Sequence, residues 1–273
     1  MMIALTGASG LVGQWLSSLA DLTLGRHDAD RPWSLAGPAP DLTGVTTLIH
    51  AAFSHVPGRY RGGEGNDPDG FLAANLDGTK RLFDAAAQQG VTRILFLSSR
   101  AVFDGLSPGA SLPETLAPKP KSLYGELKAR CEDHLFALAQ TSPLTGLSLR
   151  ATGIYGPSAP FAPPHKWTEL FADYRAGHTI VPRRGTEVHG KDLRLAARLL
   201  LMETTSGPAH VSDLLLDRRD LLSEVQRLTA CPHPPPEPCD TPVSPLICTR
   251  LNALGWRPGG MELLRQSLPA MLT

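Results

Sequence analysis

The chain has 273 residues, of which 42% are hydrophobic and 19% charged, so it is long enough to bury the core of one large domain or two small ones. Its 26 basic and 26 acidic residues cancel, which disfavours nucleic acid as a partner because no bulk field draws the chain to a phosphate backbone. The N-terminal apolar run is too short for a signal peptide, and no apolar run approaches the ~18 residues of a spanning helix. Together with the small number of cysteines, this favours a cytoplasmic protein without a membrane segment.

Apolar periodicity predicts strands that alternate with helices along the first two thirds of the chain. The predicted strands cover residues 2–6, 22–24, 47–50, 93–98 and 146–150. The predicted helices cover residues 11–19, 70–89, 123–140, 167–176 and 190–203. Because strands that alternate with helices form a parallel sheet covered on both faces, we expect an α/β fold with a doubly wound, Rossmann-type parallel sheet.

Two regions depart from this alternation. Only about 20 residues, with several prolines, separate the second strand from residue 47, so we expect one crossover helix to be missing there. Beyond residue 157 the alternation weakens and Pro-rich stretches appear at 157–164 and 231–245. We therefore expect residues 1–156 to be mainly a dinucleotide-binding domain and residues 157–273 mainly a small C-terminal substrate cap, with elements at 190–215 returning to the sheet.

A glycine-rich turn of the form TGxxGxxG lies directly after the first strand and opens the first helix. A dinucleotide pyrophosphate needs a tight turn, close backbone approach and the unpaired N–H groups of a helix N-terminus. In a chain with 26 glycines the spacing alone is weak, and a turn without a ligand is the alternative, but its place between strand and helix favours a nucleotide. The cofactor contacts predicted in this turn are Gly7, Ser9, Gly10, Leu11, Val12 and Gly13.

Tyr124 and Lys128 are four residues apart on a predicted helix, so the phenol and the ammonium share one face. The cation favours phenolate and so lowers a phenol pKa that is normally near ~10, which lets a tyrosine pass a proton near neutral pH. The alternative is a solvated pair on a helix surface.

Together these two motifs resemble the extended branch of the short-chain dehydrogenase/reductase superfamily, the NAD(P)-dependent epimerase/dehydratase family. Further stretches agree with that family in order and spacing, at residues 48–52, 67–68, 75–79, 97–103, 150–157, 188–192 and 254–258. The resemblance therefore covers almost the whole chain.

The resemblance implies roles for several residues. Ser99 would be the catalytic hydroxyl that hydrogen-bonds the reacting oxygen, Tyr124 the acid/base, and Lys128 both the tuner of Tyr124 and a ligand of the nicotinamide ribose. Ala51, Ala52 and Asn75 would contact the cofactor, and Asn75 could instead serve a proton relay. The resemblance also implies a homodimer packed through the helices around residues 75–89 and 123–140.

Departures from the family pattern narrow the expected chemistry. Arg100 and Ala101 replace the Asp-Glu pair of sugar-nucleotide 4,6-dehydratases, which disfavours dehydration. Gly153 replaces an Asn that helps to hold the substrate in many sugar-nucleotide enzymes, which disfavours a nucleotide-sugar substrate. The stretch 102–105 is closer to the dTDP-4-dehydrorhamnose reductase group. The predicted substrate contacts are Thr152, Gly153 and His165, with a solvated loop as the alternative for His165.

The end of the second strand bears on the choice of cofactor. Arg26 follows it directly and could pair with a 2′-phosphate, whereas Asp28 comes late for the acidic residue that holds the ribose of NAD. This favours NADP, with NAD possible, and an exposed loop charge is the alternative for Arg26.

These patterns predict reversible hydride transfer between a nicotinamide cofactor and a carbonyl or secondary alcohol of a small polar, possibly sugar-like substrate. Two alternatives stay open: an NAD-retaining epimerase of a sugar or sugar nucleotide, and a non-catalytic dinucleotide-sensing protein. No metal is expected, because Cys231, Cys239 and Cys248 lack a Cys-x-x-Cys pair and two of them lie in a Pro-rich loop.

Overall fold

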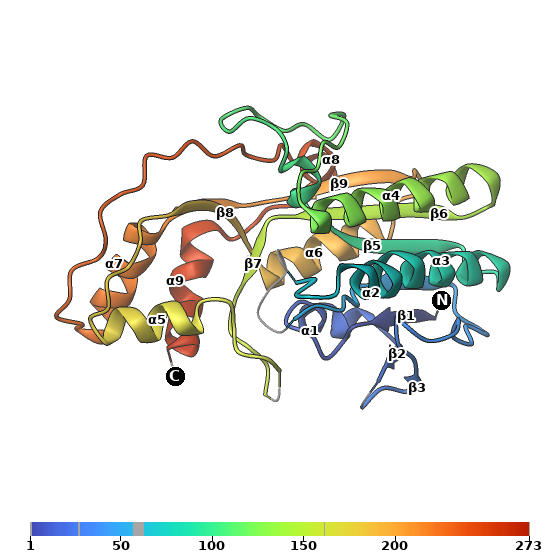
Figure 1. Ribbon diagram of the computed structural model, residues 1–273, viewed down its shortest axis with the longest axis horizontal. Coiled ribbons are helices and arrows are strands. Elements are labelled where there is room, and N and C mark those ends of the chain that lie inside the picture. The colour runs from blue at the N-terminus through green and yellow to red at the C-terminus, as the bar shows by residue number, and fades with distance from the viewer. Residues whose placement is uncertain (1, 27, 57–62, 161, 273) are drawn as a thin grey trace.

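The computed structural model describes residues 2–26, 28–56, 63–160 and 162–272. A sheet of parallel strands in the order β3-β2-β1-β4-β5-β6-β9 forms its centre (Figure 1). These strands are β1 Ile3–Thr6, β2 Leu22–Gly25, β3 Arg31–Pro32, β4 Thr47–His50, β5 Arg93–Ser99, β6 Thr145–Ala151 and β9 Gly207–Val211. The strand order reverses between β1 and β4, and in such sheets ligands bind at the carboxyl edge near that point.

Helices cover both faces of this sheet, which confirms the predicted doubly wound fold (Figure 1). One face carries α2 Pro68–Leu72, α3 Gly78–Gln88 and α4 Leu123–Thr141, with the π-helical segment Ala73–Asp77 between α2 and α3. The other face carries α1 Gly13–Leu16, α6 Gly190–Leu200 and α8 Thr249–Ala253. Successive side chains of β4 point to opposite faces of the sheet. Leu48 packs in the core under α3 and α4, and Ile49 packs in the core under α1 and α6.

A smaller lobe is built on a three-stranded sheet of order β10-β8-β7. Its strands are β7 Gly153–Tyr155, β8 Arg184–His189 and β10 Leu214–Asp217, and its helices are α5 Thr168–Arg175, α7 Arg218–Thr229 and α9 Gly260–Met271. The lobe has a hydrophobic core of its own, around Tyr155, Trp167, Phe171, Leu221 and Leu264. Figure 1 shows it beside the large sheet, with α6 and β9 back on that sheet.

Most predicted elements of the first 150 residues are confirmed, with two corrections. The first helix is shorter than predicted, because it spans only Gly13–Leu16 before a 3₁₀ turn, and the Ser17 hydroxyl donates to the Gly13 carbonyl (3.0 Å). The helix predicted from residue 70 begins at Pro68, because the Asp67 carboxylate caps the Gly70 N–H (2.9 Å). The missing crossover helix is confirmed: between β2 and β4 the described residues form only the two-residue strand β3.

Helix α1 joins the two parts of the molecule. The Trp15 ring packs on Gly190 at the start of α6, where a Cβ would lie 2.1 Å from the indole. The Gln14 side chain reaches the loop beyond β7 and accepts a hydrogen bond from the Ala159 N–H (2.5 Å). The helix that follows the glycine-rich turn is therefore held by both parts.

The described residues form neither a membrane-spanning helix nor a cluster of metal ligands. No described helix is long and apolar enough to cross a membrane. No group of three His, Cys, Asp or Glu side chains in the described segments is placed to hold a metal ion. The four cysteines are unpaired thiols.

Candidate active site

The glycine-rich turn lies between β1 and α1, against the carboxyl end of β4. Gly7 has a φ of +78°, and a Cβ there would lie 2.6 Å from the Ala52 nitrogen. A Cβ on Gly13 would lie 1.9 Å from the Gly7 carbonyl oxygen. The packing of the chain itself therefore requires Gly7 and Gly13.

Gly10 has a different environment. Among the described residues, a Cβ on Gly10 would meet only the Gly7 carbonyl oxygen within 4 Å, at 3.3 Å. The protein thus leaves room at this position, where the backbone can come close to a ligand. Next to it, Ser9 is exposed, and Leu11 and Val12 are half-buried just before α1.

A buried hydrogen-bonded chain fixes the strand ends behind the turn. Thr6 Oγ1 lies 2.7 Å from His50 Nδ1, and His50 Nε2 lies 3.0 Å from Thr79 Oγ1. Thr6 Oγ1 also accepts the Ala52 N–H (3.3 Å), which holds residues 51–52 beneath Gly7. Burial, assisted by the Lys128 charge, lowers the pKa of His50 to about 3, so the ring is neutral.

Helix α4 brings the predicted Tyr124–Lys128 pair to the end of β5. Gly125 packs on the turn that follows Ser99, since a Cβ on Gly125 would lie 2.3 Å from the Ala101 carbonyl oxygen. One turn later the Lys128 ammonium donates to the Leu97 carbonyl of β5 (2.8 Å). Ser99, Tyr124 and Lys128 are therefore brought together at the carboxyl edge of the sheet.

Ser99 is oriented by the backbone. Its hydroxyl oxygen accepts the Ala101 N–H (3.1 Å) and caps the 3₁₀ turn Arg100–Phe103. No acceptor for its hydroxyl proton is found among the described residues. That proton is thus available to a substrate oxygen.

Lys128 is a buried cation in an aromatic cage. Only 4% of its surface is exposed, and its ammonium lies 4.8 Å from the Phe53 ring centroid and 4.6 Å from that of Phe96. The same ammonium is 5.8 Å from the centroid of the Tyr124 ring, which packs edge-on against Phe53. Burial lowers the pKa of Lys128 to about 8.

This lowered pKa predicts a pH dependence of stability. Unfolded Lys128 holds its proton up to its ordinary pKa of 10.5, whereas the folded chain releases it near 8, so between these values the unfolded state binds more protons. The unfolding free energy of the wild type, minus that of Lys128→Met, should therefore rise by about 2 kcal/mol from about pH 7 to about pH 9.5. Urea titrations across this range measure the difference, and a flat or falling difference would contradict a buried charged lysine.

Two interactions that the sequence analysis missed hold α4 in place. The Asp104 carboxylate accepts the N–H groups of Lys121 (2.6 Å) and Ser122 (3.2 Å), and Ser122 in turn caps α4 through the Gly125 N–H (3.1 Å). Further along α4, the buried Glu132 carboxylate pairs with the Arg150 guanidinium of β6 at 2.7 Å. Helix α4 is thereby held at its N-terminus by the turn that follows β5 and at its middle by β6.

Asn75 lies in the π-helical segment and binds backbone. Its side chain accepts the Ser54 N–H and donates to the Ser54 carbonyl, both at 2.7 Å, and also donates to the Phe71 carbonyl at 3.0 Å. It therefore fixes the segment that follows β4 and carries Phe53 to the Lys128 cage.

Arg26 is exposed directly after β2, at the edge of the sheet that carries the glycine-rich turn. Asp28, two residues on, has a left-handed φ of +49°. Asp30 is engaged elsewhere, since its carboxylate accepts the Thr23 N–H (2.8 Å) and hydroxyl (2.7 Å).

The three predicted substrate contacts lie in different surroundings. Thr152 is buried, and its hydroxyl donates to the Val211 carbonyl (3.4 Å). Both ring nitrogens of His165 are used by backbone: Nδ1 accepts the Trp167 N–H (3.2 Å) and Nε2 lies 2.8 Å from the Met271 carbonyl oxygen. Gly153 opens β7 beside the ion pair of Lys166 and Glu187.

Comparison with known proteins shows which family the chain belongs to. Residues 38–207 match the NAD dependent epimerase/dehydratase family. A curated relative, UDP-glucose 4-epimerase of Vibrio cholerae, is 30% identical in an alignment of 176 residues that covers 57% of this chain and 52% of that protein. The chain thus spans about half the length of that relative.

Three solved structures share the fold of this chain. The UDP-glucose 4-epimerase of Thermus thermophilus in complex with NAD has a TM-score of 0.77 at 24% identity over 99% of both chains. MoeE5 in complex with UDP-glucuronic acid and NAD has a TM-score of 0.78 at 21% identity, over 100% of this chain and 98% of that one. DesIV, a dTDP-glucose 4,6-dehydratase from Streptomyces venezuelae with NAD and TYD bound, has a TM-score of 0.78 at 22% identity, over 99% and 96%.

Fold, site and comparisons together define the class of protein. The chain belongs to the NAD-dependent epimerase/dehydratase family. It is an enzyme of that family, as its TGxxGxxG turn and its Tyr124–Lys128 pair predicted.

Proposed function

We propose that this enzyme transfers a hydride between a nicotinamide cofactor and a carbonyl or secondary alcohol of a small polar, sugar-like substrate. The observation that carries the proposal is the convergence of Ser99, Tyr124 and Lys128 at the sheet edge next to the glycine-rich turn. The room left at Gly10 fits the pyrophosphate of a dinucleotide, with Ala51, Ala52 and Asn75 shaping the adjoining wall. When bound, the nicotinamide supplies or accepts the hydride.

The protein's own part in this chemistry is proton transfer. In the reductive direction Tyr124 donates a proton to the substrate oxygen, and the Ser99 hydroxyl donates a hydrogen bond to the same oxygen. The Lys128 ammonium next to the Tyr124 ring stabilises the phenolate that is left. In the oxidative direction the same groups act in reverse.

A cofactor-retaining epimerase is the second candidate, and the likeness to UDP-glucose 4-epimerase favours it. In such an enzyme one carbon is oxidised and then reduced again, so cofactor is not consumed. The purified protein is incubated with NAD(P)H and a set of keto-sugars, and separately with NAD and UDP-glucose. Oxidation of many equivalents of NAD(P)H supports the first function, and formation of the 4-epimer without net cofactor change supports the second. If neither occurs, both candidates are contradicted.

NADP is the proposed cofactor, although the solved relatives named above hold NAD. Arg26 follows β2 where a side chain meets the adenosine ribose, and a guanidinium binds a 2′-phosphate that NAD lacks. Arg26→Ala is therefore expected to weaken NADP binding about ten- to a hundredfold and to leave NAD binding unchanged. Calorimetric titration with both nucleotides measures this.

Arg194→Ala is the matched control, since it removes a partly exposed cation of α6 that hydrogen-bonds the Ser18 hydroxyl at 3.4 Å. If the wild type prefers NAD, or if Arg26→Ala weakens both nucleotides equally, Arg26 is not a phosphate ligand. Asp28 then becomes the candidate ribose ligand, and the epimerase gains support.

A homodimer and a cytoplasmic location stay predictions. The helices of the predicted dimer face, α3 and α4, lie side by side and are joined by His134 and Asp84 (2.7 Å). Thr152, Gly153 and His165 likewise stay predicted substrate contacts.

A further inference from the structure

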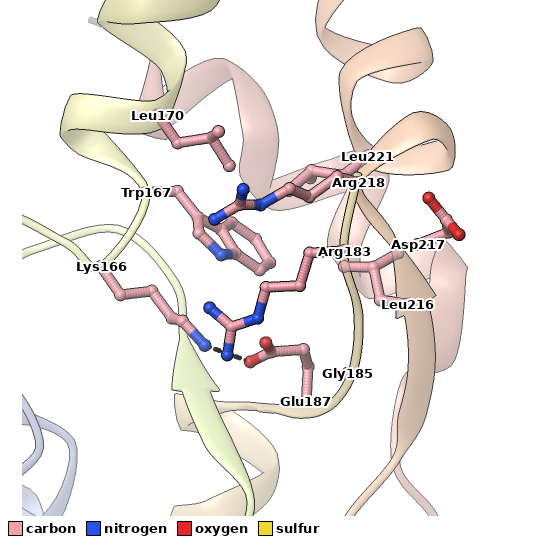
Figure 2. A pocket seen from close by; sticks show the side chains of 10 residues that line it. All are labelled: Lys166, Trp167, Leu170, Arg183, Gly185, Glu187, Leu216, Asp217, Arg218 and Leu221. Carbon is pink, nitrogen blue, oxygen red and sulfur yellow. Dashed lines mark hydrogen bonds and ion pairs between the residues drawn. The ribbon is translucent and has the colours of Figure 1, made fainter. Parts of the chain in front are cut away.

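A cavity lies in the smaller lobe, between α5, β8 and the corner where β10 turns into α7 (Figure 2). Its lining consists of Lys166, Trp167, Leu170, Arg183, Gly185, Glu187, Leu216, Asp217, Arg218 and Leu221. Trp167 lines it just before α5, at the end of the loop that follows β7. This wall of the cavity therefore belongs to the stretch of chain that starts at the end of β7.

The Gln14 side chain joins the glycine-rich turn to that stretch. Gln14 follows Gly13 on α1, and both ends of its amide are used: Nε2 donates to the Leu11 carbonyl (2.8 Å), and Oε1 accepts the Ala159 N–H (2.5 Å). Leu11 belongs to the turn, and Ala159 lies in the loop that follows β7. One side chain thus bridges the predicted nucleotide site and the loop that leads to the cavity.

The loop at Ala159 depends on this bridge. Ala159 is exposed, and its neighbours at positions 157 and 160 are prolines, which have no N–H to donate. Within the described part of the chain, no other hydrogen bond joins residues 157–160 to a helix or a strand. Gln14 therefore fixes this part of the loop.

A row of packed rings makes a second connection from α1. The Trp15 ring lies 5.2 Å from the His189 ring, between centroids. His189 lies 5.0 Å from Tyr155, and Tyr155 stacks on Trp167 at 4.9 Å. His189, Tyr155 and Trp167 are buried. The row starts next to Gln14 and ends in the cavity wall that Figure 2 shows.

Two glycines let the indole of Trp15 lie against the backbone. Gly156 has a φ of +138°, and a Cβ there would lie 2.7 Å from Trp15 Cζ2 and 2.9 Å from His189 Nε2. A Cβ on Gly190 would lie 2.1 Å from the same indole. Because closely packed side chains transmit small displacements, a shift of α1 reaches the start of the loop after β7.

We propose that residues 14 and 15 of α1 couple the dinucleotide site to the cavity of the smaller lobe. A dinucleotide that orders the glycine-rich turn also orders the loop at Ala159, through the positioning residue Gln14. Through the row of rings that starts at Trp15, it also orders the cavity wall at Trp167. The proposal rests on the proposed function, because it requires a dinucleotide at the turn.

The coupling favours binding of both ligands together. A ligand that enters the smaller lobe loses less conformational entropy when the loop and the cavity wall are already ordered. It therefore binds more tightly once the dinucleotide is in place, and linkage requires that it strengthens dinucleotide binding by the same factor.

Exchange of backbone amides with water, measured by NMR, tests this coupling without a substrate. One reporter is the Ala159 N–H at the bridge. The other is the Trp167 N–H at the cavity wall, which donates to His165 Nδ1 (3.2 Å). Both rates are measured without nucleotide and with saturating NADP or NAD, and calorimetry on the same samples measures nucleotide binding.

Three substitutions separate the parts of the device. Gln14→Ala removes both hydrogen bonds of the bridge. Gln14→Glu keeps an acceptor for the Ala159 N–H, but its carboxylate has no proton to donate to the Leu11 carbonyl. Trp15→Phe removes the part of the indole that lies on Gly156 and keeps an aromatic ring.

Gln89→Ala is the matched control. Gln89 also uses both ends of its amide on backbone, since it accepts the Leu42 N–H (2.7 Å) and donates to the Pro40 carbonyl (3.0 Å). It lies just after α3 and contacts neither the turn nor the loop after β7. This substitution removes equivalent hydrogen bonds without touching the proposed connection.

Saturating nucleotide is expected to slow both exchange rates about fivefold or more in the wild type and in Gln89→Ala. In Gln14→Ala the Ala159 N–H should exchange rapidly with or without nucleotide. In Gln14→Glu it should stay slower than in Gln14→Ala and yet not respond to nucleotide, which a merely structural contact would not predict. In Trp15→Phe the response of Trp167 should fall to less than half, while that of Ala159 persists.

The inference is overturned if nucleotide binds the wild type without slowing exchange at Ala159, or if the full response survives in Gln14→Glu. An undiminished response of Trp167 in Trp15→Phe overturns the part assigned to the rings. Absence of nucleotide binding in the wild type, seen by calorimetry, contradicts the proposed function and this inference with it. Binding without a change in exchange contradicts the inference alone.

Discussion

Replacing Tyr124 by phenylalanine is expected to lower turnover by a factor on the order of 10² or more, with cofactor affinity little changed. The substitution removes the proposed proton donor and keeps the ring that packs against Phe53 at 5.2 Å between centroids. Lys128 and its hydrogen bond to Leu97 are untouched, so the fold of the site should persist. Steady-state turnover and dinucleotide titration on the same preparation measure the two quantities.

Tyr174→Phe is the matched control for this experiment. It removes a phenol hydroxyl of the smaller lobe that donates to the His233 carbonyl (2.7 Å), outside the proposed proton path. Turnover should stay close to that of the wild type. Near-normal turnover in Tyr124→Phe would remove Tyr124 from the mechanism.

Gly10→Val is expected to abolish dinucleotide binding and to leave a folded protein. The added side chain meets little of the part of the chain that the structure describes, where a Cβ at Gly10 has only the Gly7 carbonyl oxygen within 4 Å, at 3.3 Å. It projects instead into the room where the pyrophosphate must approach the backbone. Circular dichroism and thermal melting report the fold, and nucleotide titration reports binding.

Gly13→Ala provides the contrast. Its Cβ would lie 1.9 Å from the Gly7 carbonyl oxygen, so this smaller substitution should destabilise the turn itself and lower the melting temperature. Nucleotide affinity retained in Gly10→Val would mean that the glycines serve only the turn.

Local patterns predicted the large sheet well. Strands β4 and β5 are short apolar runs and α4 has helical periodicity, so their residues alone define them. The motif residues Gly10, Tyr124 and Lys128 could be placed because each lies on an element of that kind, directly after a strand or on a regular helix.

In the smaller lobe the helix predicted over residues 167–176 is confirmed as α5, but the strands were not predictable in the same way. Strand β8 has the sequence RGTEVH, without an apolar run, and it is a strand only because β7 and β10 pair with it. Helix α9 contains Pro269, which sequence rules interpret as a helix boundary. The cavity combines residues from 166–170, 183–187 and 216–221, and their proximity depends on tertiary packing.

One signal of the cavity was nevertheless present in the sequence. Gly153 departs from the family pattern, and the departure argued against an Asn contact to the substrate. In the structure the side chains of Lys166 and Glu187 occupy the space that a side chain at position 153 would take. The aromatic cage of Lys128 gave no such signal, because Phe53 lies after β4 and Phe96 on β5, far from it in the chain.

The contact of Trp15 with Gly190, and the return of β9 to the edge of β6, bear on how proteins of this architecture acquire new substrates. A chain ending after residue 156 would bare the indole and leave β6 as an unprotected edge strand, which invites aggregation. The smaller lobe is therefore no exchangeable module, since the large sheet is completed by the same stretch of chain. We therefore expect new specificity to arise by substitutions within the shared framework rather than by exchange of a whole lobe.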